Sequence, residues 1–150
     1  MKIGIGNDHS ALELKAEIIE LLKEKGHEVV DYGTNSPESC DYPVYGEKVG
    51  RAVASGEVER GILICGTGIG VSISANKFPG AYAALVSDVY SAQRARLSND
   101  ANIMCMGAFT TGNKERELFV DAFLTNEFEP GCASQPKVDA FHKYDDEHSK

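Results

Sequence analysis

The sequence predicts a Rossmann-like α/β fold, a doubly wound five-stranded parallel sheet followed by a C-terminal helix. Short apolar runs alternate five times with stretches of helical periodicity, as expected for strands joined by crossover helices. One run, Gly61-Ile-Leu-Ile-Cys65, has no polar residue and is typical of a strand covered on both faces. The 150 residues suit one domain, and no linker or repeat divides them, so we expect 1–150 to form a single domain.

Turn and capping residues delimit the elements in the first half of the chain. Ser10-Ala-Leu-Glu13 has the pattern of a capping box, and Gly26 suits the end of the helix that it starts. Pro43 suits the first turn of the next helix, which Gly56 ends. The remaining segments are a strand at Lys2–Gly6, a strand at His27–Tyr32, a loop at Gly33–Tyr42 and the apolar strand that ends at Cys65.

The second half continues the same alternation. A glycine-rich segment, Gly66-Thr-Gly-Ile-Gly70, follows the apolar strand directly and leads into a helix. Pro79-Gly80 and Pro130-Gly131 mark breaks between elements. The segments expected in order are a helix to about Lys77, a strand at Ala81–Val86, a helix at Asp88–Leu97, a strand at Ile103–Gly107, a helix at Lys114–Leu124 and a C-terminal helix at about Ser134–His148.

Composition narrows the class of protein. Asp and Glu number 23 against 15 Lys and Arg, so the net charge is −8, which disfavours nucleic acid or an anionic membrane as partner. No apolar run reaches the roughly 20 residues of a membrane span, and the N-terminus lacks the apolar segment of a signal peptide. The four cysteines are widely spaced, with no zinc-type cluster. We therefore expect reduced thiols in a cytoplasmic protein.

Parallel sheets bind ligands at the carboxyl ends of their strands, so polar residues directly after a strand are candidates. Asp8 and His9 come directly after the first strand and are candidate ligand-binding residues. The alternatives are that Asp8 caps a helix and that His9 is an ordinary surface residue. Asn99 precedes the fifth strand and so lies at the opposite end, where a simple turn is the alternative.

Cys65 ends the apolar strand and stands at the start of the following helix, where free N–H groups favour negative charge. It is therefore a candidate reactive thiol, the alternative being a small apolar strand residue. The segment Gly66–Gly70 has the composition of an anion cradle for a substrate oxyanion or phosphate. It fails the dinucleotide fingerprint, because Val71 stands where a glycine is needed, and it lacks the lysine of a P-loop.

Together these motifs resemble the ribose-5-phosphate isomerase B family, which includes the galactose-6-phosphate isomerase subunits. The resemblance is ordered along residues 2–130, and the stretch Ile64–Gly70 is its most specific part. Its motifs are Asn7-Asp-His-Ser10, Asp41-Tyr-Pro43, GILICGTGIG at Gly61–Gly70, Ser72-Ile-Ser-Ala-Asn-Lys77 and Ser98-Asn-Asp-Ala-Asn102.

The resemblance implies an aldose–ketose isomerase that uses neither metal nor cofactor and moves a proton between C1 and C2 through a cis-enediol. By this resemblance Cys65 is the base, and Thr67 with the loop stabilises the oxyanion. A second subunit of a homodimer or homotetramer supplies Asn99, and residues 131–150 are expected to pack on that partner. The substrate-binding set so implied is Asp8, His9, Gly66, Gly68, Ile69, Gly70, Ser98, Asn99 and Lys137.

Three positions depart from the family pattern. Ser98 stands where the family has a ring-opening histidine, and Phe109 and Cys132 stand where it has phosphate-binding arginines. Lys137 is a candidate substitute for a further arginine. Arg94 with Arg96 could form a relocated anion site, the alternative being that both are solvated charges on their helix. The sequence therefore predicts a sugar or sugar phosphate other than ribose 5-phosphate, one that is shorter, is largely open-chain or lacks a phosphate at the usual end. The alternative is a non-catalytic sugar-phosphate-binding or regulatory protein.

Overall fold

The computed structural model describes residues 1–149 and contains one five-stranded sheet. All strand pairs are parallel, and the strand order is β2-β1-β3-β5-β4. The order reverses direction between β1 and β3, as in a doubly wound sheet, so the predicted fold class is confirmed. The strands are β1 (Lys2–Asn7), β2 (Glu28–Asp31), β3 (Arg60–Cys65), β4 (Ala83–Leu85) and β5 (Ile103–Gly107).

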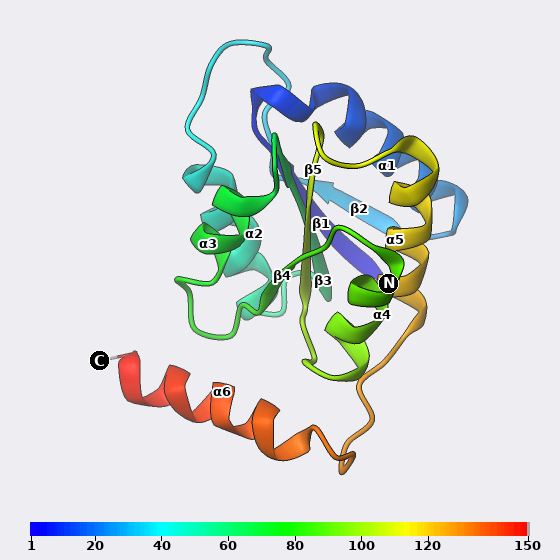
Figure 1. Cartoon of the computed structure of the whole chain (residues 1–150). Helices are drawn as coiled ribbons and strands as arrows, with labels where there is room; N and C mark the ends of the chain where they lie inside the picture. The colour runs from blue at the N-terminus through cyan, green and yellow to red at the C-terminus, as the bar shows by residue number, and fades with distance from the viewer. Residues whose placement is uncertain (150) are drawn as a thin grey trace.

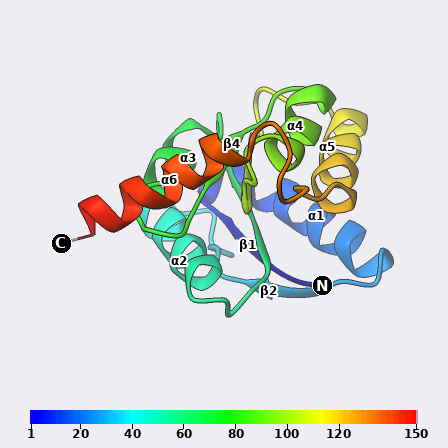
Figure 2. The ribbon, with the colours of Figure 1, turned by 90° about the horizontal axis from the view of Figure 1, so that it is seen from below.

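Helices cover both faces of the sheet. Figure 2 shows α1, α4 and α5 on one side and α2 and α3 on the other. Within residues 1–149, no helix is long and apolar enough to cross a membrane. The helices are the 3-10 helix η1 (His9–Ala11), α1 (Leu12–Glu24), α2 (Pro43–Ala54), α3 (Ile69–Ala75), α4 (Val89–Leu97), α5 (Asn113–Thr125) and α6 (Gln135–His148).

The core consists of two apolar layers separated by the sheet. Strand β3 is buried along its whole length, as its apolar sequence predicts. Phe119 and Phe123 of α5 pack with α1 on one face, and Val49 and Val53 of α2 pack with α3 residues on the other. Burying a large apolar side chain contributes about 1.5–3 kcal/mol, so these two layers fix the strand positions from which the loops emerge.

The start of α1 differs from the sequence prediction. Ser10 does not act as a capping residue, because a turn of 3-10 helix separates β1 from α1. Asp8 caps this turn instead, and one of its carboxylate oxygens accepts hydrogen bonds from the Ser10 amide and hydroxyl. The N-cap of α1 is Ala11, which has no side chain that could serve. The capping-box prediction was therefore wrong.

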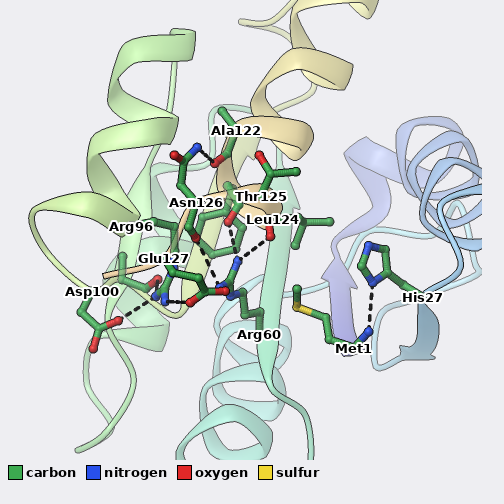
Figure 3. A network of polar contacts seen from close by, with 12 residues as sticks. Met1, His27, Arg60, Arg96, Asp100, Ala122, Leu124, Thr125, Asn126 and Glu127 are labelled. Carbon is green, nitrogen blue, oxygen red and sulfur yellow. Dashed lines mark hydrogen bonds and ion pairs between the residues drawn. The ribbon is translucent and has the colours of Figure 1, made fainter. Parts of the chain in front are cut away.

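A network of ion pairs joins α4, β3 and the chain after α5 at the amino ends of the strands (Figure 3). Arg60 and Arg96 are 5% and 6% exposed, and both bind the carboxylate of Glu127. Arg96 also donates to the carbonyl of Ala101 and pairs with Asp100 at 3.0 Å. Burial alone would raise the pKa of Glu127, but the two guanidinium groups outweigh it and lower that pKa.

Helix α6 lies apart from the two helical layers, at the end of the sheet opposite the carboxyl ends of the strands (Figure 1). Val138 is buried, and the carboxylate of Asp145 accepts hydrogen bonds from the amide of Gly80 and the hydroxyl of Tyr82. Burial and this carboxylate raise the pKa of the Tyr82 hydroxyl. These contacts hold the helix beside the start of β4, and packing of residues 131–150 on a partner subunit stays a prediction.

Candidate functional site

The carboxyl ends of β1 and β3 bring together the residues that the sequence singled out. The two strands are neighbours with Asn7 paired to Ile64, so Asp8 and Cys65 follow at adjacent positions. Strand β5 lies on the other side of β3, with Gly107 paired to Cys65. The segments after these three strands therefore surround one site, as expected from the reversal of strand order between β1 and β3.

Cys65 is the buried thiol of this site. The residue is 4% exposed, and its sulfur accepts a hydrogen bond from the amide of Gly68 at 3.1 Å. Gly68 has a φ of 77°, and a Cβ there would lie 2.8 Å from the backbone of Met106. Only glycine fits this position, and its backbone turn directs the amide at the sulfur. Burial raises the pKa of the Cys105 thiol on β5, so that thiol stays neutral.

The loop after Cys65 is pressed closely against its surroundings. A Cβ on Gly70 would lie 2.3 Å from the ring of Tyr42, and one on Gly107 would lie 2.7 Å from the backbone of Thr67. Thr67 is itself exposed, and its hydroxyl accepts from the amide of Ile69 at 3.3 Å. The loop can therefore present amide groups and the Thr67 hydroxyl to an oxygen that becomes negatively charged during a reaction.

Asp8 and His9 occupy the neighbouring strand end. Asp8 is buried and caps η1, so it is the capping residue that the sequence offered as an alternative. His9 is half-buried, and its Nδ1 accepts a hydrogen bond from the amide of Cys40 at 3.2 Å. Because Nδ1 accepts this hydrogen bond, Nε2 is the ring nitrogen left to contact a ligand.

Sequence reasoning had singled out neither Cys40 nor Arg116. Cys40 lies 31 residues from His9, and no local pattern indicates that its amide fixes the imidazole. Arg116 is on α5 and lines, with His9 and Phe109, a cavity of about 490 Å³ beside the glycine loop. Contacts between distant segments of this kind have no signature in a single sequence.

Ser98 and Asn99 lie at the far end of the sheet from Cys65. They precede β5 at its amino end, whereas Cys65 pairs with the last residue of that strand. At about 3.3 Å per residue, five strand residues separate the two ends by roughly 13 Å or more. Asn99 is exposed and lines a second cavity of about 460 Å³ together with Leu85 and Phe141. Within one chain these residues cannot join the thiol.

The other candidate substitutes for the missing arginines lie in different parts of the structure. Lys137 is exposed on α6 and also lies away from the glycine loop. Arg96 is committed to Glu127, Asp100 and a backbone carbonyl, so it is not the relocated anion site that the sequence allowed. Arg94 lines a third cavity, of about 260 Å³, together with Cys132.

Comparison with known proteins places this geometry in a family. Residues 3–141 match the profile of the Ribose/Galactose Isomerase family. The chain is 48% identical to ribose-5-phosphate isomerase B of Escherichia coli over 139 residues, 93% of each chain. It is 42% identical to D-erythrulose-4-phosphate isomerase of Pectobacterium atrosepticum over 146 residues, covering 97% of this chain and 95% of the relative.

The solved structure of ribose-5-phosphate isomerase B from Clostridium thermocellum superimposes with a TM-score of 0.95 at 46% identity, covering 99% of each chain. Because these relatives are named as isomerases, they support the catalytic interpretation and not the non-catalytic alternative. The profile match covers nearly the whole described chain, and the motif around Cys65 sits at the strand end where the resemblance required it. The chain belongs to the ribose/galactose isomerase family.

Proposed function

We propose that the protein interconverts an aldose phosphate and a ketose phosphate, with Cys65 as the base. The observation that carries this proposal is the hydrogen bond from the Gly68 amide to the Cys65 sulfur, beside Asp8 and His9. An amide that donates to sulfur stabilises a thiolate there, and a thiolate is a competent base for a proton next to a carbonyl.

The reaction needs no other reactant. The Cys65 thiolate takes the proton from C2 of the aldose, the electrons of that C–H bond form the C1=C2 double bond, and the π electrons of the carbonyl move to O1. The proton of the O2 hydroxyl passes to O1 of this cis-enediolate, and the thiol returns its proton to C1 as O2 becomes the ketone oxygen. The amides of the Gly66–Gly70 loop that do not donate to Cys65 or Thr67, together with the Thr67 hydroxyl, hold the oxygen on which negative charge develops. Loss of one such donor costs about 3–4 kcal/mol.

We propose further that Asn99 and Ser98 act in the site of a second copy of the chain, in a cytoplasmic homodimer or larger oligomer. Two observations support this: Asn99 lies at the wrong end of its own sheet, and α3, β4 and α4 expose large apolar side chains beside the open edge at β4. A second copy would cover these side chains, which are Ile69, Ile73, Leu85, Val89 and Tyr90.

The preferred substrate we propose is a tetrose 4-phosphate, the class to which D-erythrulose 4-phosphate belongs. A tetrose phosphorylated on O4 has no free hydroxyl with which to close a five-membered ring, so its carbonyl needs no ring-opening acid or base. Ser98 cannot supply that function near neutral pH, because a hydroxyl does not titrate there. Ribose 5-phosphate does close such a ring, and it should therefore be a poorer substrate.

A panel of sugars tests the proposal. We expect conversion of D-erythrose 4-phosphate to its ketose, and in D₂O the product should carry deuterium at C1 from solvent exchange at the base. Ribose 5-phosphate, galactose 6-phosphate and the unphosphorylated sugars serve as comparisons, and Cys65→Ala serves as the blank. Absence of turnover on every phosphorylated aldose and ketose in the panel would refute an isomerase function.

A further inference from the structure

The cavity between α1 and α5 is an additional part of the site. It holds about 490 Å³ and is walled by His9, Glu13 and Glu17 on one side and by Phe109, Asn113 and Arg116 on the other. Phe109 links it to the catalytic loop, because a Cβ on Gly66 would lie 3.0 Å from the Phe109 ring. The cavity thus begins beside the first residue of the glycine loop.

Two hydrogen bonds connect Arg116 to the backbone of the residue that supplies the base. The amide of Ala108 donates to the carbonyl of Cys65 at 2.8 Å, and the carbonyl of Ala108 accepts from Arg116 at 2.8 Å. Standard bond lengths across one residue then limit the path from the Cys65 carbonyl to the guanidinium to about 9 Å. An open-chain tetrose or pentose phosphate covers a distance of this order between its carbonyl carbon and its phosphate.

Hydrogen bonds hold the guanidinium of Arg116 in place without engaging all of its N–H donors. Its Nε donates to the Thr111 hydroxyl at 2.9 Å, and a terminal nitrogen donates to the Asn113 side chain at 2.8 Å. With the bond to Ala108, three of its five N–H groups are engaged, which leaves two for a ligand. No carboxylate within residues 1–149 forms an ion pair with it, so its charge is not neutralised by an acidic partner.

The other charges around the cavity set the strength of binding. His9, whose Nδ1 is engaged by the Cys40 amide, can offer Nε2 from the opposite wall. Glu13 and Glu17 are exposed on α1 and oppose an anion, although solvent screens them more than it screens a group deeper in the cavity. A fixed guanidinium with two free donors suits the bidentate recognition of a phosphate group.

We propose that Arg116 binds the terminal phosphate of the substrate in a subsite between α1 and α5. Arg116 thereby supplies the positive charge that Phe109 cannot offer. The inference rests on the proposed function for the identity of the ligand. It also gives that function a specificity: the phosphate is recognised within the same chain that supplies Cys65. Arg94, which lines a separate cavity with Cys132, has no part in it.

Steady-state kinetics on the full-length protein provides the first test. Arg116→Gln should raise KM for D-erythrose 4-phosphate by about tenfold or more, with kcat changed much less, because charge-assisted hydrogen bonds to the phosphate are lost. Its kcat/KM for unphosphorylated erythrose should not change, and Arg116→Lys should recover part of the loss. Arg94→Gln is the matched control and should keep the wild-type KM. An unchanged KM in Arg116→Gln would overturn the proposal.

Binding of erythritol 4-phosphate, which has no carbonyl to isomerise, separates this inference from the proposed function. Calorimetry should show weaker binding to Arg116→Gln than to wild type, even if no sugar is turned over. Because Arg116 also supports the turn after β5, that variant could fail to fold. Glu13→Gln then decides: removal of an exposed negative charge from the cavity should tighten binding about two- to threefold at low salt. Unchanged affinity in that variant would place the phosphate elsewhere.

Discussion

The amide of Gly68 donates a hydrogen bond to the sulfur of Cys65 over 3.1 Å, three residues along the chain. The contact requires that the backbone turn back sharply at the end of a buried strand, and Gly68 makes this turn with a φ of 77°. A donor held in this way favours negative charge on sulfur and needs no rearrangement during the reaction. This single relationship links the local backbone to the proposed chemistry.

Replacing Cys65 by alanine should abolish most turnover while preserving the fold. The residue is buried at 4% exposure, and alanine fits the same strand position. Loss of a positioned base typically costs about 10²–10⁴ in rate. The measurement is kcat on the substrate identified by the sugar panel, with the melting temperature measured alongside. Cys105→Ala, which removes a neutral buried thiol, should keep wild-type kcat. Wild-type kcat in Cys65→Ala would mean that another group is the base.

Gly68→Ala should impair both stability and activity. A Cβ there would lie 2.7 Å from Leu85 and 2.8 Å from the backbone of Met106, so the loop must shift and the amide leaves the sulfur. Gly26→Ala is the matched control, because Gly26 has a φ of 84° with nothing within 4 Å of a Cβ. It should lose about 1 kcal/mol of stability and no kcat. Equal kcat in the two variants would contradict the role given to the Gly68 amide.

Mixing two inactive variants tests whether the site is shared between subunits. Cys65→Ala and Asn99→Ala should each be inactive alone, but co-expressed with different tags they should recover activity in the mixed oligomer. In a mixed dimer, one site has both substituted residues and the other has neither. With random pairing, about a quarter of the wild-type activity is expected. Purified mixed dimers without activity would show that Asn99 does not act on the partner's Cys65.

Ser98→His should shift the substrate preference. An imidazole titrates near neutral pH and can move the proton that ring opening requires, which a serine hydroxyl cannot. We expect kcat/KM for ribose 5-phosphate to rise at least about tenfold, while the value for D-erythrose 4-phosphate stays within about twofold. The ratio of the two values is the measurement, since it cancels any difference in active fraction. A ratio unchanged from wild type would remove ring opening as the basis of the preference.

Glu127→Gln should make stability less sensitive to acid. The arginines lower the pKa of Glu127 in the folded state, so its stabilising contribution is present above the unfolded pKa and is lost as the pH falls through the folded pKa. Wild type should thus lose more melting temperature between about pH 5 and pH 3 than the variant does.

At pH 7 the same variant should melt lower than wild type, because Arg60 and Arg96 stay buried without their shared carboxylate. Glu38→Gln, at an exposed loop position, should show neither effect. Parallel acid curves for Glu127→Gln and wild type would contradict the pairing shown in Figure 3.

The sequence by itself determined the fold and one half of the site. Periodicity and turn residues located the five strands and the six α-helices but not the 3-10 turn η1, because apolar patterns depend only on nearby residues. The position of Cys65 between a buried strand and a glycine loop was readable for the same reason, and Asp8 and His9 followed from parallel strand direction. The capping assignment failed because Asp8, two residues earlier, competed for the same turn.

The tertiary structure alone decided the contacts between segments distant in the chain. It joined the Cys40 amide to His9 and put Arg116 beside the glycine loop. It also buried Arg96 against Glu127, which a helical pattern presents as a solvated charge. Such pairings depend on how the helices pack across the sheet, and packing is set by the shapes of many side chains together. No single local pattern carries that information.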